Sequence, residues 1–299
     1  MATGAKIGFI GIGNMGGPMA ANLIKAGFDV TVYDSDKQRM ADFAEDHDCA
    51  VAASLAELGK GADIVIAMLP TGPIVRGVLL EEEDGALSES LAKGSIVIDM
   101  SSSEPVGTKE LAAALAENGI TLIDAPVSGG IPGAVGATLS IMIGADDEAV
   151  VATVMPLFEA MGKNMFRTGA TGSGHATKAL NNFLAATNYA VAAEAIILGR
   201  KFGLDPKLLT EIIQVSSGRN TAIEGAIPKQ VLTGKFAAGF AIGLMAKDVK
   251  ITGDMAKDLG AVAPLSQFMA AHWEKARDAL GADADFTAAY KAWSDANGL

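Results

Sequence analysis

The first 34 residues most strongly constrain the fold of this chain. An apolar run at 6–12 leads into the pattern Gly11-x-Gly13-x-x-Gly16, and a helical stretch follows that ends at Gly27. A second apolar run, at 28–33, ends at Asp34. Strand, glycine turn, helix, strand and acid in this order are typical of a dinucleotide-binding βαβ unit, in which glycines let the backbone approach a pyrophosphate at the helix N-terminus. A glycine-rich turn without a ligand is the alternative.

The alternation of strands and helices continues to about residue 170. Apolar runs predict strands at 63–68, 95–100, 121–124 and 139–144, and helical patterns occupy 36–46 and 104–118. Such alternation predicts a parallel sheet with helices on both faces. The acidic run at 81–84 is interpreted as a solvated loop.

The second half of the chain is predicted to contain only helices. The longest, at 174–202, is apolar on nearly every face and is expected to be buried. Further helical patterns lie at 206–215, 227–232, 243–259, 264–280 and 286–296. We therefore expect an α/β protein with a Rossmann-type dinucleotide-binding domain at 1–170 and an all-α substrate and oligomerisation domain at 171–299. The long helix joins the two, and the cleft between them is the expected active site.

Charge and composition narrow the function classes. The net charge of -12 disfavours nucleic acid and anionic membranes as partners. No apolar run reaches membrane-spanning length without interruption. The single cysteine, Cys49, excludes an internal disulfide and fits a reducing compartment. These features predict a soluble, cytoplasmic protein.

Two segments carry candidate catalytic chemistry. Ser128-Gly129-Gly130 closely follows the strand that ends at Asp124, and such a turn can aim backbone N–H groups at an anion, although a plain glycine-rich turn is an alternative. Lys178 lies on the long helix with Asn182 four residues later on the same face and Asn181 close beside them. A lysine at the start of a buried helix is either a proton donor beside a polar substrate or a side chain that extends outward to solvent.

Four motifs together resemble the β-hydroxyacid dehydrogenases, the family of 3-hydroxyisobutyrate dehydrogenase and tartronate semialdehyde reductase. They are Gly11-Ile12-Gly13-Asn14-Met15-Gly16 with Met19-Ala20-x-Asn22-Leu23, Asp124 to Gly130, Gly172-x-Gly174-x-x-x-Lys178-x-x-Asn181-Asn182, and Lys247-Asp248. The resemblance extends from residue 6 to about residue 250 and implies an enzyme that transfers a hydride between a nicotinamide cofactor and a small β-hydroxyacid or semialdehyde.

The resemblance also implies roles for individual residues. Lys178 corresponds to the catalytic general acid–base, Asn182 to a substrate-orienting residue with Asn181 beside it, and the Ser128-Gly129-Gly130 loop to the substrate carboxylate site. The cofactor would contact the glycine turn, Asp34, Met68, Leu69, Pro70, Ser102 and Lys247. No spacing typical of metal ligands appears.

One residue departs from the family pattern. Position 175 usually carries an amide side chain in this family, whereas this chain has His175. Its position three residues before Lys178 would let it touch substrate or perturb the lysine, but a solvent-facing histidine at the helix start is the favoured interpretation. Arg219, in the segment 216–220 that is expected to set specificity, is interpreted as a helix-capping residue rather than a partner for an acid.

The sequence is compatible with several other functions. Imine reductases resemble this architecture but usually lack the lysine, and 6-phosphogluconate dehydrogenases carry histidine where Asn181 stands. A non-catalytic dinucleotide-binding module is a further alternative.

Asp34 followed by Ser35 favours NAD over NADP, because a carboxylate accepts hydrogen bonds from ribose hydroxyls and repels a 2′-phosphate. The apolar long helix predicts a homodimer or homotetramer.

Overall fold

The computed structural model describes residues 4–81 and 85–299, so most of the predicted acidic loop at 81–84 lies outside the described residues. The chain forms two compact units, Met1–Lys178 and Ala179–Leu299. The boundary falls within one continuous helix, α9 (Ser173–Phe202), which both units share. Each unit has its own hydrophobic core.

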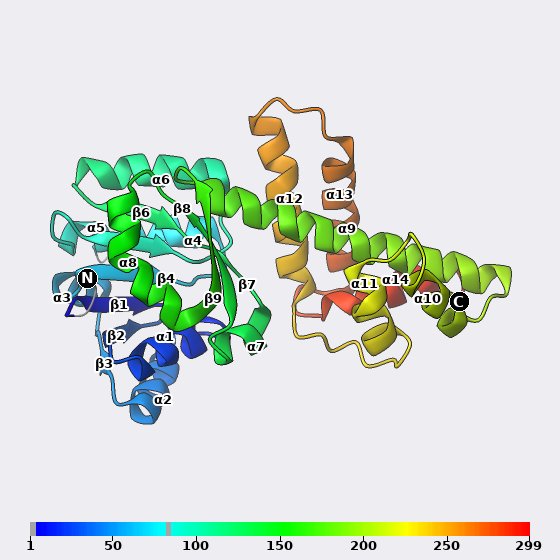
Figure 1. The fold of residues 1–299 in the computed structure, drawn as a ribbon, viewed down its shortest axis with the longest axis horizontal. Coiled ribbons are helices and arrows are strands. Elements are labelled where there is room, and N and C mark those ends of the chain that lie inside the picture. The colour runs from blue at the N-terminus through cyan, green and yellow to red at the C-terminus, as the bar shows by residue number, and fades with distance from the viewer. Residues whose placement is uncertain (1–3, 82–84) are drawn as a thin grey trace. The chain divides into compact units, whose positions relative to one another are not determined.

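The first unit alternates strands and helices along the chain (Figure 1). Its strands are β1 (Lys6–Ile10), β2 (Asp29–Tyr33), β3 (Ala50–Val51), β4 (Ile64–Ala67), β5 (Ile96–Asp99), β6 (Thr121–Asp124), β7 (Val127–Ser128), β8 (Leu139–Gly144) and β9 (Gly162–Gly169). Its helices are α1 (Gly16–Lys25), α2 (Lys37–His47), α3 (Leu55–Gly61), α4 (Gly72–Arg76), the π-helical turn η1 (Gly77–Glu81), α5 (Leu87–Ser90), α6 (Pro105–Glu117), α7 (Gly130–Val135) and α8 (Glu148–Met161).

The strands form one sheet in the order β3-β2-β1-β4-β5-β6-β8-β7, with β9 paired to β8. From β3 to β6 all pairs are parallel, which confirms the predicted doubly wound architecture. The strand order reverses between β1 and β4, and open α/β sheets bind ligands at such a point. The sheet departs from the predicted parallel arrangement at the far edge, where β8 runs antiparallel to β6 and β7.

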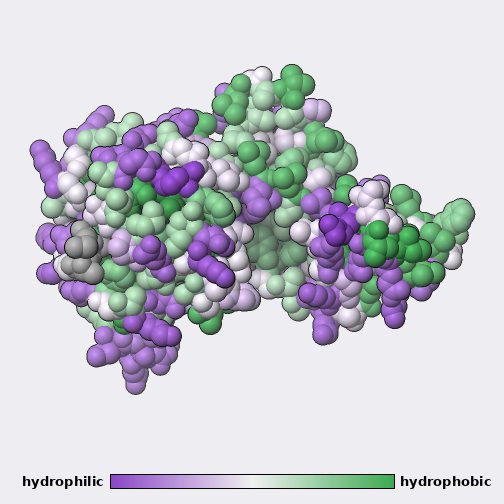
Figure 2. All heavy atoms as spheres, in the orientation of Figure 1, coloured by the Kyte–Doolittle hydropathy of each residue, from purple (hydrophilic) through white to green (hydrophobic). Residues whose placement is uncertain are grey.

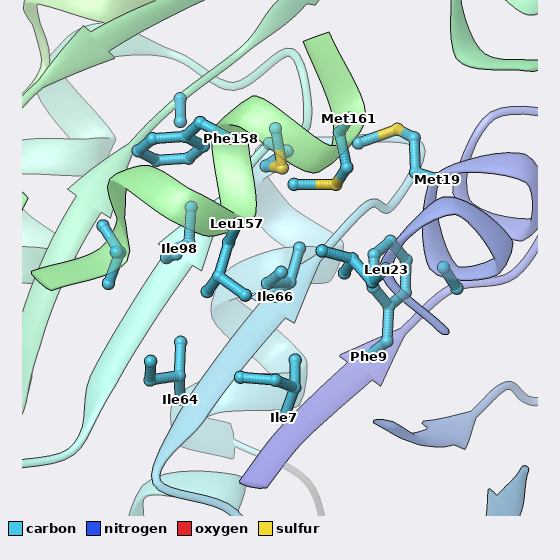
Figure 3. Close-up of a cluster of buried hydrophobic side chains, with 14 of the residues drawn as sticks. Ile7, Phe9, Met19, Leu23, Ile64, Ile66, Ile98, Leu157, Phe158 and Met161 are labelled. Carbon is cyan, nitrogen blue, oxygen red and sulfur yellow. The ribbon is translucent and has the colours of Figure 1, made fainter. Parts of the chain in front are cut away.

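Alternate residues of the central strands build two cores on opposite faces of the sheet. Ile64 and Ile66 face the first core, together with Leu157 and Phe158 of α8 (Figure 3). Between them in sequence, Val65 faces the second core, which includes residues from α3, η1, α5 and α6. Strands covered on both faces read as continuous apolar runs, and this is why these strands were recognisable in the sequence.

The second unit is helical in the described residues, and its elements follow α9 along the chain. They are α10 (Pro206–Gln214), α11 (Thr221–Glu224), the π-helical turn η2 (Ile227–Val231), α12 (Ile242–Asp258), α13 (Pro264–Leu280), the 3₁₀ turn η3 (Phe286–Ala288) and α14 (Ala289–Asp295). Its core gathers Tyr189, Trp273, Phe286 and Trp293, with ring centroids 5.1–6.4 Å apart. The Tyr189 hydroxyl donates a 2.7 Å hydrogen bond to the Thr287 carbonyl, so its polar end is satisfied inside this core.

The prediction that α9 is buried all round is wrong. Its inner face is buried at Tyr189, Ala193 and Ile196, but Leu184 and Leu198 are 60% and 58% exposed. Because apolar residues occur on both faces of α9, the sequence does not distinguish the face packed in the core from the solvent-exposed face. Among the described residues, no helix is long and apolar enough to cross a bilayer.

Candidate functional site

The glycine turn after β1 has the geometry that a dinucleotide requires. Gly11 has φ +88°, and a Cβ built there would lie 2.4 Å from the Met68 carbonyl oxygen. A Cβ on Gly16 would lie 1.8 Å from the Gly11 carbonyl oxygen, so α1 packs directly on the turn. A Cβ on Gly13 would meet nothing within 4 Å among the described residues. The first glycine makes the turn, the third permits close helix packing, and the second leaves open space where a pyrophosphate can approach the backbone.

Asp34 lies at the carboxyl end of β2 and is only 7% exposed. Its Oδ2 accepts a 2.9 Å hydrogen bond from the Ile12 backbone N–H, and its Oδ1 accepts one of 2.9 Å from the Asp36 N–H. The Arg39 guanidinium donates to the same Oδ1 at 3.2 Å. The acid is therefore fixed beside the glycine turn, where a ribose is expected, and the residues present fit a nicotinamide dinucleotide.

A second buried carboxylate, Asp99 at the end of β5, organises the loop after β5 and, through Ser101, contacts the loop after β4. Its Oδ1 accepts from the Ser101 backbone N–H at 2.9 Å, and its Oδ2 accepts from the Ser103 hydroxyl at 2.8 Å. The Ser101 hydroxyl in turn accepts from the Leu69 N–H at 2.9 Å. This chain of bonds joins the loop that contains Met68, Leu69 and Pro70 to the loop that contains Ser102. The sequence pattern had not singled out Asp99.

The Ser128-Gly129-Gly130 segment forms the exposed connection from β7 to α7. Gly129 and Gly130 have φ values of +137° and +60°, which L residues with side chains rarely adopt. Asn22 of α1 donates a 2.6 Å hydrogen bond from its side-chain nitrogen to the Ala134 carbonyl of α7. This bond holds α7, which follows the predicted carboxylate-binding segment, against α1, which follows the predicted cofactor-binding turn.

The N-terminus of α9 is held by Asp124, the last residue of β6. Its two carboxylate oxygens accept from the backbone N–H groups of Gly172 and His175 at 2.7 and 2.8 Å. Burial raises the pKa of the Asp124 carboxyl, opposed by the neighbouring His175 and by these hydrogen bonds. A Cβ on Gly174 would lie 2.3 Å from the Met142 carbonyl oxygen, so glycine permits this close approach. The carboxylate satisfies helix N–H groups that would otherwise be buried without a partner.

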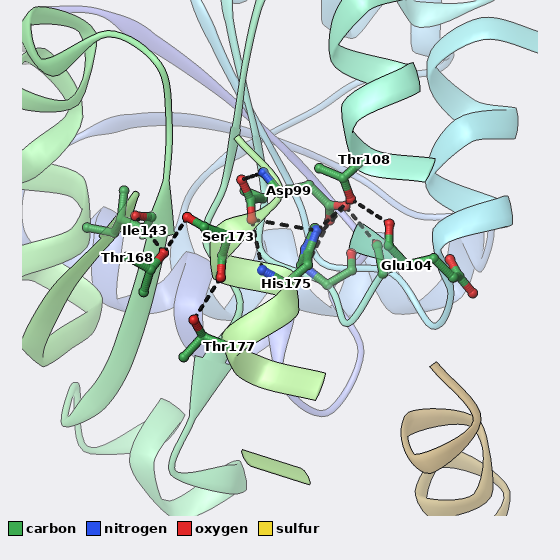
Figure 4. A network of polar contacts seen from close by, with 12 residues as sticks. Asp99, Glu104, Thr108, Ile143, Thr168, Ser173, His175 and Thr177 are labelled. Carbon is green, nitrogen blue, oxygen red and sulfur yellow. Dashed lines mark hydrogen bonds and ion pairs between the residues drawn. The ribbon is translucent and has the colours of Figure 1, made fainter. Parts of the chain in front are cut away.

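The interpretation of His175 as a solvent-facing residue is wrong. The residue is 1% exposed, and its Nδ1 lies 2.7 Å from the Thr108 hydroxyl of α6 (Figure 4). Its Nε2 lies 3.7 Å from Asp99 Oδ2, and its Nδ1 lies 3.9 Å from Asp124 Oδ2. These partners precede it by 51 to 76 positions, and no local pattern reveals them.

Lys178 is half-buried on α9 and is the last residue of the first unit. It follows the anchored first turn by three residues, so the backbone that carries it is fixed by Asp124.

In the second unit, Asn182 donates a 2.6 Å hydrogen bond to Asp248 Oδ2 of α12. Asn181 is exposed and donates to Asn182 Oδ1 at 3.1 Å. Lys247 Nζ lies 3.1 Å from Asp248 Oδ1. The structure therefore brings Asn182 and Lys247 together at Asp248, with Asn181 bonded to Asn182. Asp248 is only 3% exposed, and the sequence had suggested it merely as a neighbour of Lys247.

Arg219 does not cap a helix, contrary to the sequence interpretation. Its Nε lies 3.4 Å from Glu224 Oε1, and both side chains are exposed. The Asn220 side chain caps α11 instead, accepting from the Ala222 and Ile223 N–H groups at 3.0 and 3.1 Å. No cluster of three or more His, Cys, Asp or Glu side chains within residues 4–81 and 85–299 could hold a metal ion.

Two protein-family models together match most of the chain. Residues 6–169 match the model of the NAD binding domain of 6-phosphogluconate dehydrogenase, and residues 172–293 match the model described as NAD-binding of NADP-dependent 3-hydroxyisobutyrate dehydrogenase. The chain is 38% identical to 2-(hydroxymethyl)glutarate dehydrogenase of Eubacterium barkeri, over 100% of this chain and 98% of the relative. It is 36% identical to the NAD-dependent L-serine dehydrogenase of Pseudomonas aeruginosa, over 98% and 99% of the two chains.

A solved structure shares the whole architecture. The 3-hydroxyisobutyrate dehydrogenase of Mycobacterium tuberculosis, described with L-serine, superposes with a TM-score of 0.86 at 34% identity, covering 97% of this chain and 99% of the other.

Proposed function

The chain belongs to the β-hydroxyacid dehydrogenase family, and we propose that it is a NAD-dependent oxidoreductase that interconverts a small β-hydroxyacid and the corresponding semialdehyde. 3-Hydroxyisobutyrate, tartronate semialdehyde and compounds of similar size are the substrate class. A nicotinamide dinucleotide supplies the hydride acceptor or donor at C4 of its ring. The protein has to position the substrate and manage one proton.

The anchoring of the first turn of α9 by Asp124 is the observation that carries this proposal. The buried carboxylate receives two backbone hydrogen bonds from that turn, and the turn leads directly into Lys178. A fixed helix start restricts where the lysine amine can reach, and this restriction is what a general acid–base requires.

Lys178 would exchange one proton with the substrate oxygen. In oxidation, the neutral amine takes the proton from the substrate hydroxyl while the carbon-bound hydrogen leaves with its electron pair as hydride. In reduction, the ammonium gives a proton to the carbonyl oxygen as the hydride arrives at carbon. Atoms and charge balance in both directions, and no metal ion is required.

The other residues would orient the substrate. Ser128, Gly129 and Gly130 would bind its carboxylate through hydroxyl and backbone N–H groups, as such turns do for anions. Asn182, oriented by Asp248, would hydrogen-bond the reacting oxygen side of the substrate, with Asn181 beside it. Lys247 would lie at the nicotinamide end of the cofactor.

NAD is the proposed cofactor because Asp34 is a fixed carboxylate next to the glycine turn. It would accept hydrogen bonds from the ribose hydroxyls and repel a 2′-phosphate. An NADP-preferring reductase of a related aldehyde or imine is the second candidate, favoured by one observation. Arg39, 3.2 Å from Asp34, carries the charge that a 2′-phosphate would need. A non-catalytic dinucleotide-binding module is disfavoured by the presence of Lys178.

We further propose a cytoplasmic homodimer or homotetramer. The free Cys49 supports a reducing compartment. The exposed apolar side chains of the helical unit support self-association.

The direct test is NADH formation with a panel of small hydroxyacids, followed by the Lys178→Ala variant. We expect turnover of that variant to fall by about 10²–10⁴-fold, the usual contribution of a general acid–base group, while NADH binding is retained. Near-normal turnover by correctly folded Lys178→Ala would reject the role of the lysine. Absence of activity of the wild-type protein on every hydroxyacid would reject the function.

A further inference from the structure

His175 lies between two buried carboxylates that serve different parts of the proposed site. Asp124, on one side, anchors the first turn of α9 through backbone bonds. Asp99, on the other side, organises the 101–103 loop. Figure 4 shows the His175 imidazole between Asp99 and Thr108.

The surroundings of the two ring nitrogens favour a hydrogen on Nε2. Among the described residues Nε2 has no hydrogen-bond partner, and it lies 3.7 Å from Asp99 Oδ2. A bare lone pair on Nε2 would face a carboxylate inside the protein, which is unfavourable. The Thr108 hydroxyl lies 2.7 Å from Nδ1 and can donate to it, or it can donate to the Glu104 carbonyl at 3.0 Å and accept from Nδ1. When it donates to Nδ1, Nε2 is the nitrogen that carries the hydrogen, and that hydrogen is directed at Asp99.

Asp99 Oδ2 connects this hydrogen to the cofactor loops. The same oxygen accepts the Ser103 hydroxyl at 2.8 Å, while Oδ1 accepts the Ser101 N–H. The Ser101 hydroxyl continues to the Leu69 N–H at 2.9 Å. A displacement of the Asp99 carboxylate would therefore move both loops that are expected to contact the dinucleotide.

We propose that His175 is a positioning residue that couples these cofactor loops to the first turn of α9, and through it to Lys178. Cofactor binding at the loops and the placement of the lysine amine are then linked through the 3.7 Å contact between Nε2 and Asp99 Oδ2. The proposal rests on the proposed function, and it adds a route by which the cofactor site and the proton donor act together.

Two amide substitutions separate this role from simple space filling. In His175→Gln, the side-chain nitrogen takes the place of Nε2 and keeps a donor directed at Asp99. In His175→Asn, the amide takes the place of Nδ1 and keeps only the Thr108 contact. His175→Leu removes both contacts. Thr177→Ala is the matched control, because Thr177 is close to His175 on α9 and is exposed. Among the described residues its hydroxyl donates to the Ser173 carbonyl of its own helix at 2.8 Å.

Two readouts need no substrate: the Kd for NADH by fluorescence titration, and hydrogen–deuterium exchange of the peptide 172–178 with and without NADH. We expect NADH to slow exchange in this peptide for the wild-type protein, His175→Gln and Thr177→Ala. For His175→Asn and His175→Leu we expect the Kd to rise about tenfold, on the scale of one lost polar contact with a buried carboxylate, and the slowing by NADH to disappear.

Equal behaviour of the Gln and Asn variants, or a His175→Leu variant that keeps both the affinity and the slowed exchange, overturns the proposal. Should the His175 variants fail to fold, Ser103→Ala removes the hydroxyl that donates to Asp99 Oδ2 and changes no residue of α9. It should raise the Kd and abolish the slowing, and unchanged values would also overturn the proposal. A wild-type protein that shows NADH-dependent protection but oxidises no hydroxyacid would reject the proposed function alone.

Discussion

Asp34 combines burial with three donors. Its oxygens accept from two backbone N–H groups and from Arg39, so the carboxylate cannot turn away without leaving these groups unpaired. A carboxylate held in one position discriminates better between a ribose hydroxyl and a 2′-phosphate than a mobile carboxylate does, because it cannot move away from the negative charge of the phosphate.

Replacing this acid should change the cofactor preference. We expect Asp34→Asn combined with Ser35→Arg to shift the ratio of kcat/KM for NAD over NADP by at least about tenfold toward NADP, equivalent to about 1.4 kcal/mol. Steady-state kinetics with both cofactors on one substrate measure this ratio. A wild-type protein with the higher kcat/KM for NADP would show that Arg39, rather than Asp34, dominates the site.

Residues of the site differ in how far the sequence could predict them. Asp34 was predictable because the strand that ends at it and the glycine turn lie within one short segment. The burial of His175 was not, since Thr108, Asp124 and Asp99 come from three other elements and meet it only in the folded chain. Asp248 was noticed next to Lys247, but its bond to Asn182 joins two helices 66 positions apart.

Among the elements, the turn between β1 and α1 offers a matched pair of substitutions. Gly16→Ala places a methyl group 1.8 Å from a backbone oxygen, and we expect destabilisation of more than about 3 kcal/mol, the upper range for overpacking. Gly13→Ala meets no described atom within 4 Å, so its Tm should be unchanged while its Kd for NADH rises. Thermal unfolding and NADH titration of both variants measure this. A stable Gly16→Ala, or a Gly13→Ala that binds NADH normally, would contradict the assigned glycine roles.

Elements with strong local signals were predictable, and those set by the length of a connection were not. The helix start at Pro206 was predictable because proline fits the first helical position. The antiparallel direction of β8 depends on α7, a helix of 6 residues that rises only about 9 Å. A helix of this length cannot carry the chain back along the full length of a six-residue strand, about 20 Å, as a parallel strand would require. The connection therefore reverses the chain, and no residue pattern signals this.

The packing of α13 on α14 predicts a pH-dependent stability. His272 stacks on Trp293 with centroids 4.7 Å apart and on Phe268 at 5.9 Å. Burial lowers the pKa of His272 below the ordinary value of 6.5, opposed by Glu194 and assisted by Lys275. In the window below 6.5 the unfolded chain binds more protons than the folded one, so this contribution to stability is present above 6.5 and is lost as the pH falls.

His272→Phe keeps the stacking and removes the titration. Its Tm should therefore fall less than that of the wild-type protein when the pH is lowered through this window, as measured by thermal unfolding at a series of pH values. Parallel Tm curves for the two proteins would contradict the contribution of His272.

At the scale of the whole molecule, the exposed apolar side chains are concentrated in the helical unit. Along α9, Leu180, Leu184, Val191, Leu198 and Phe202 are 47–85% exposed. Their spacings of four and seven residues place them in one stripe, the pattern of a helix that packs against a partner helix. The turn between α12 and α13 adds Leu259 and Val262 at 70% and 98% exposure, and Figure 2 shows the hydrophobic surface at this turn.

A second copy of the chain is the occupant we predict for this stripe, because helices with heptad-spaced apolar residues pair readily with their own kind. Static light scattering at micromolar concentration should give two or four times the chain mass of 30.4 kDa. Leu198→Glu with Phe202→Glu should lower that mass, because two charges would be buried without partners in the interface. Phe166→Glu is the matched control, since Phe166 is 53% exposed but lies on β9 in the other unit. A mass near that of one chain for the wild-type protein would exclude self-association, and an unchanged mass for the double variant would place the interface elsewhere.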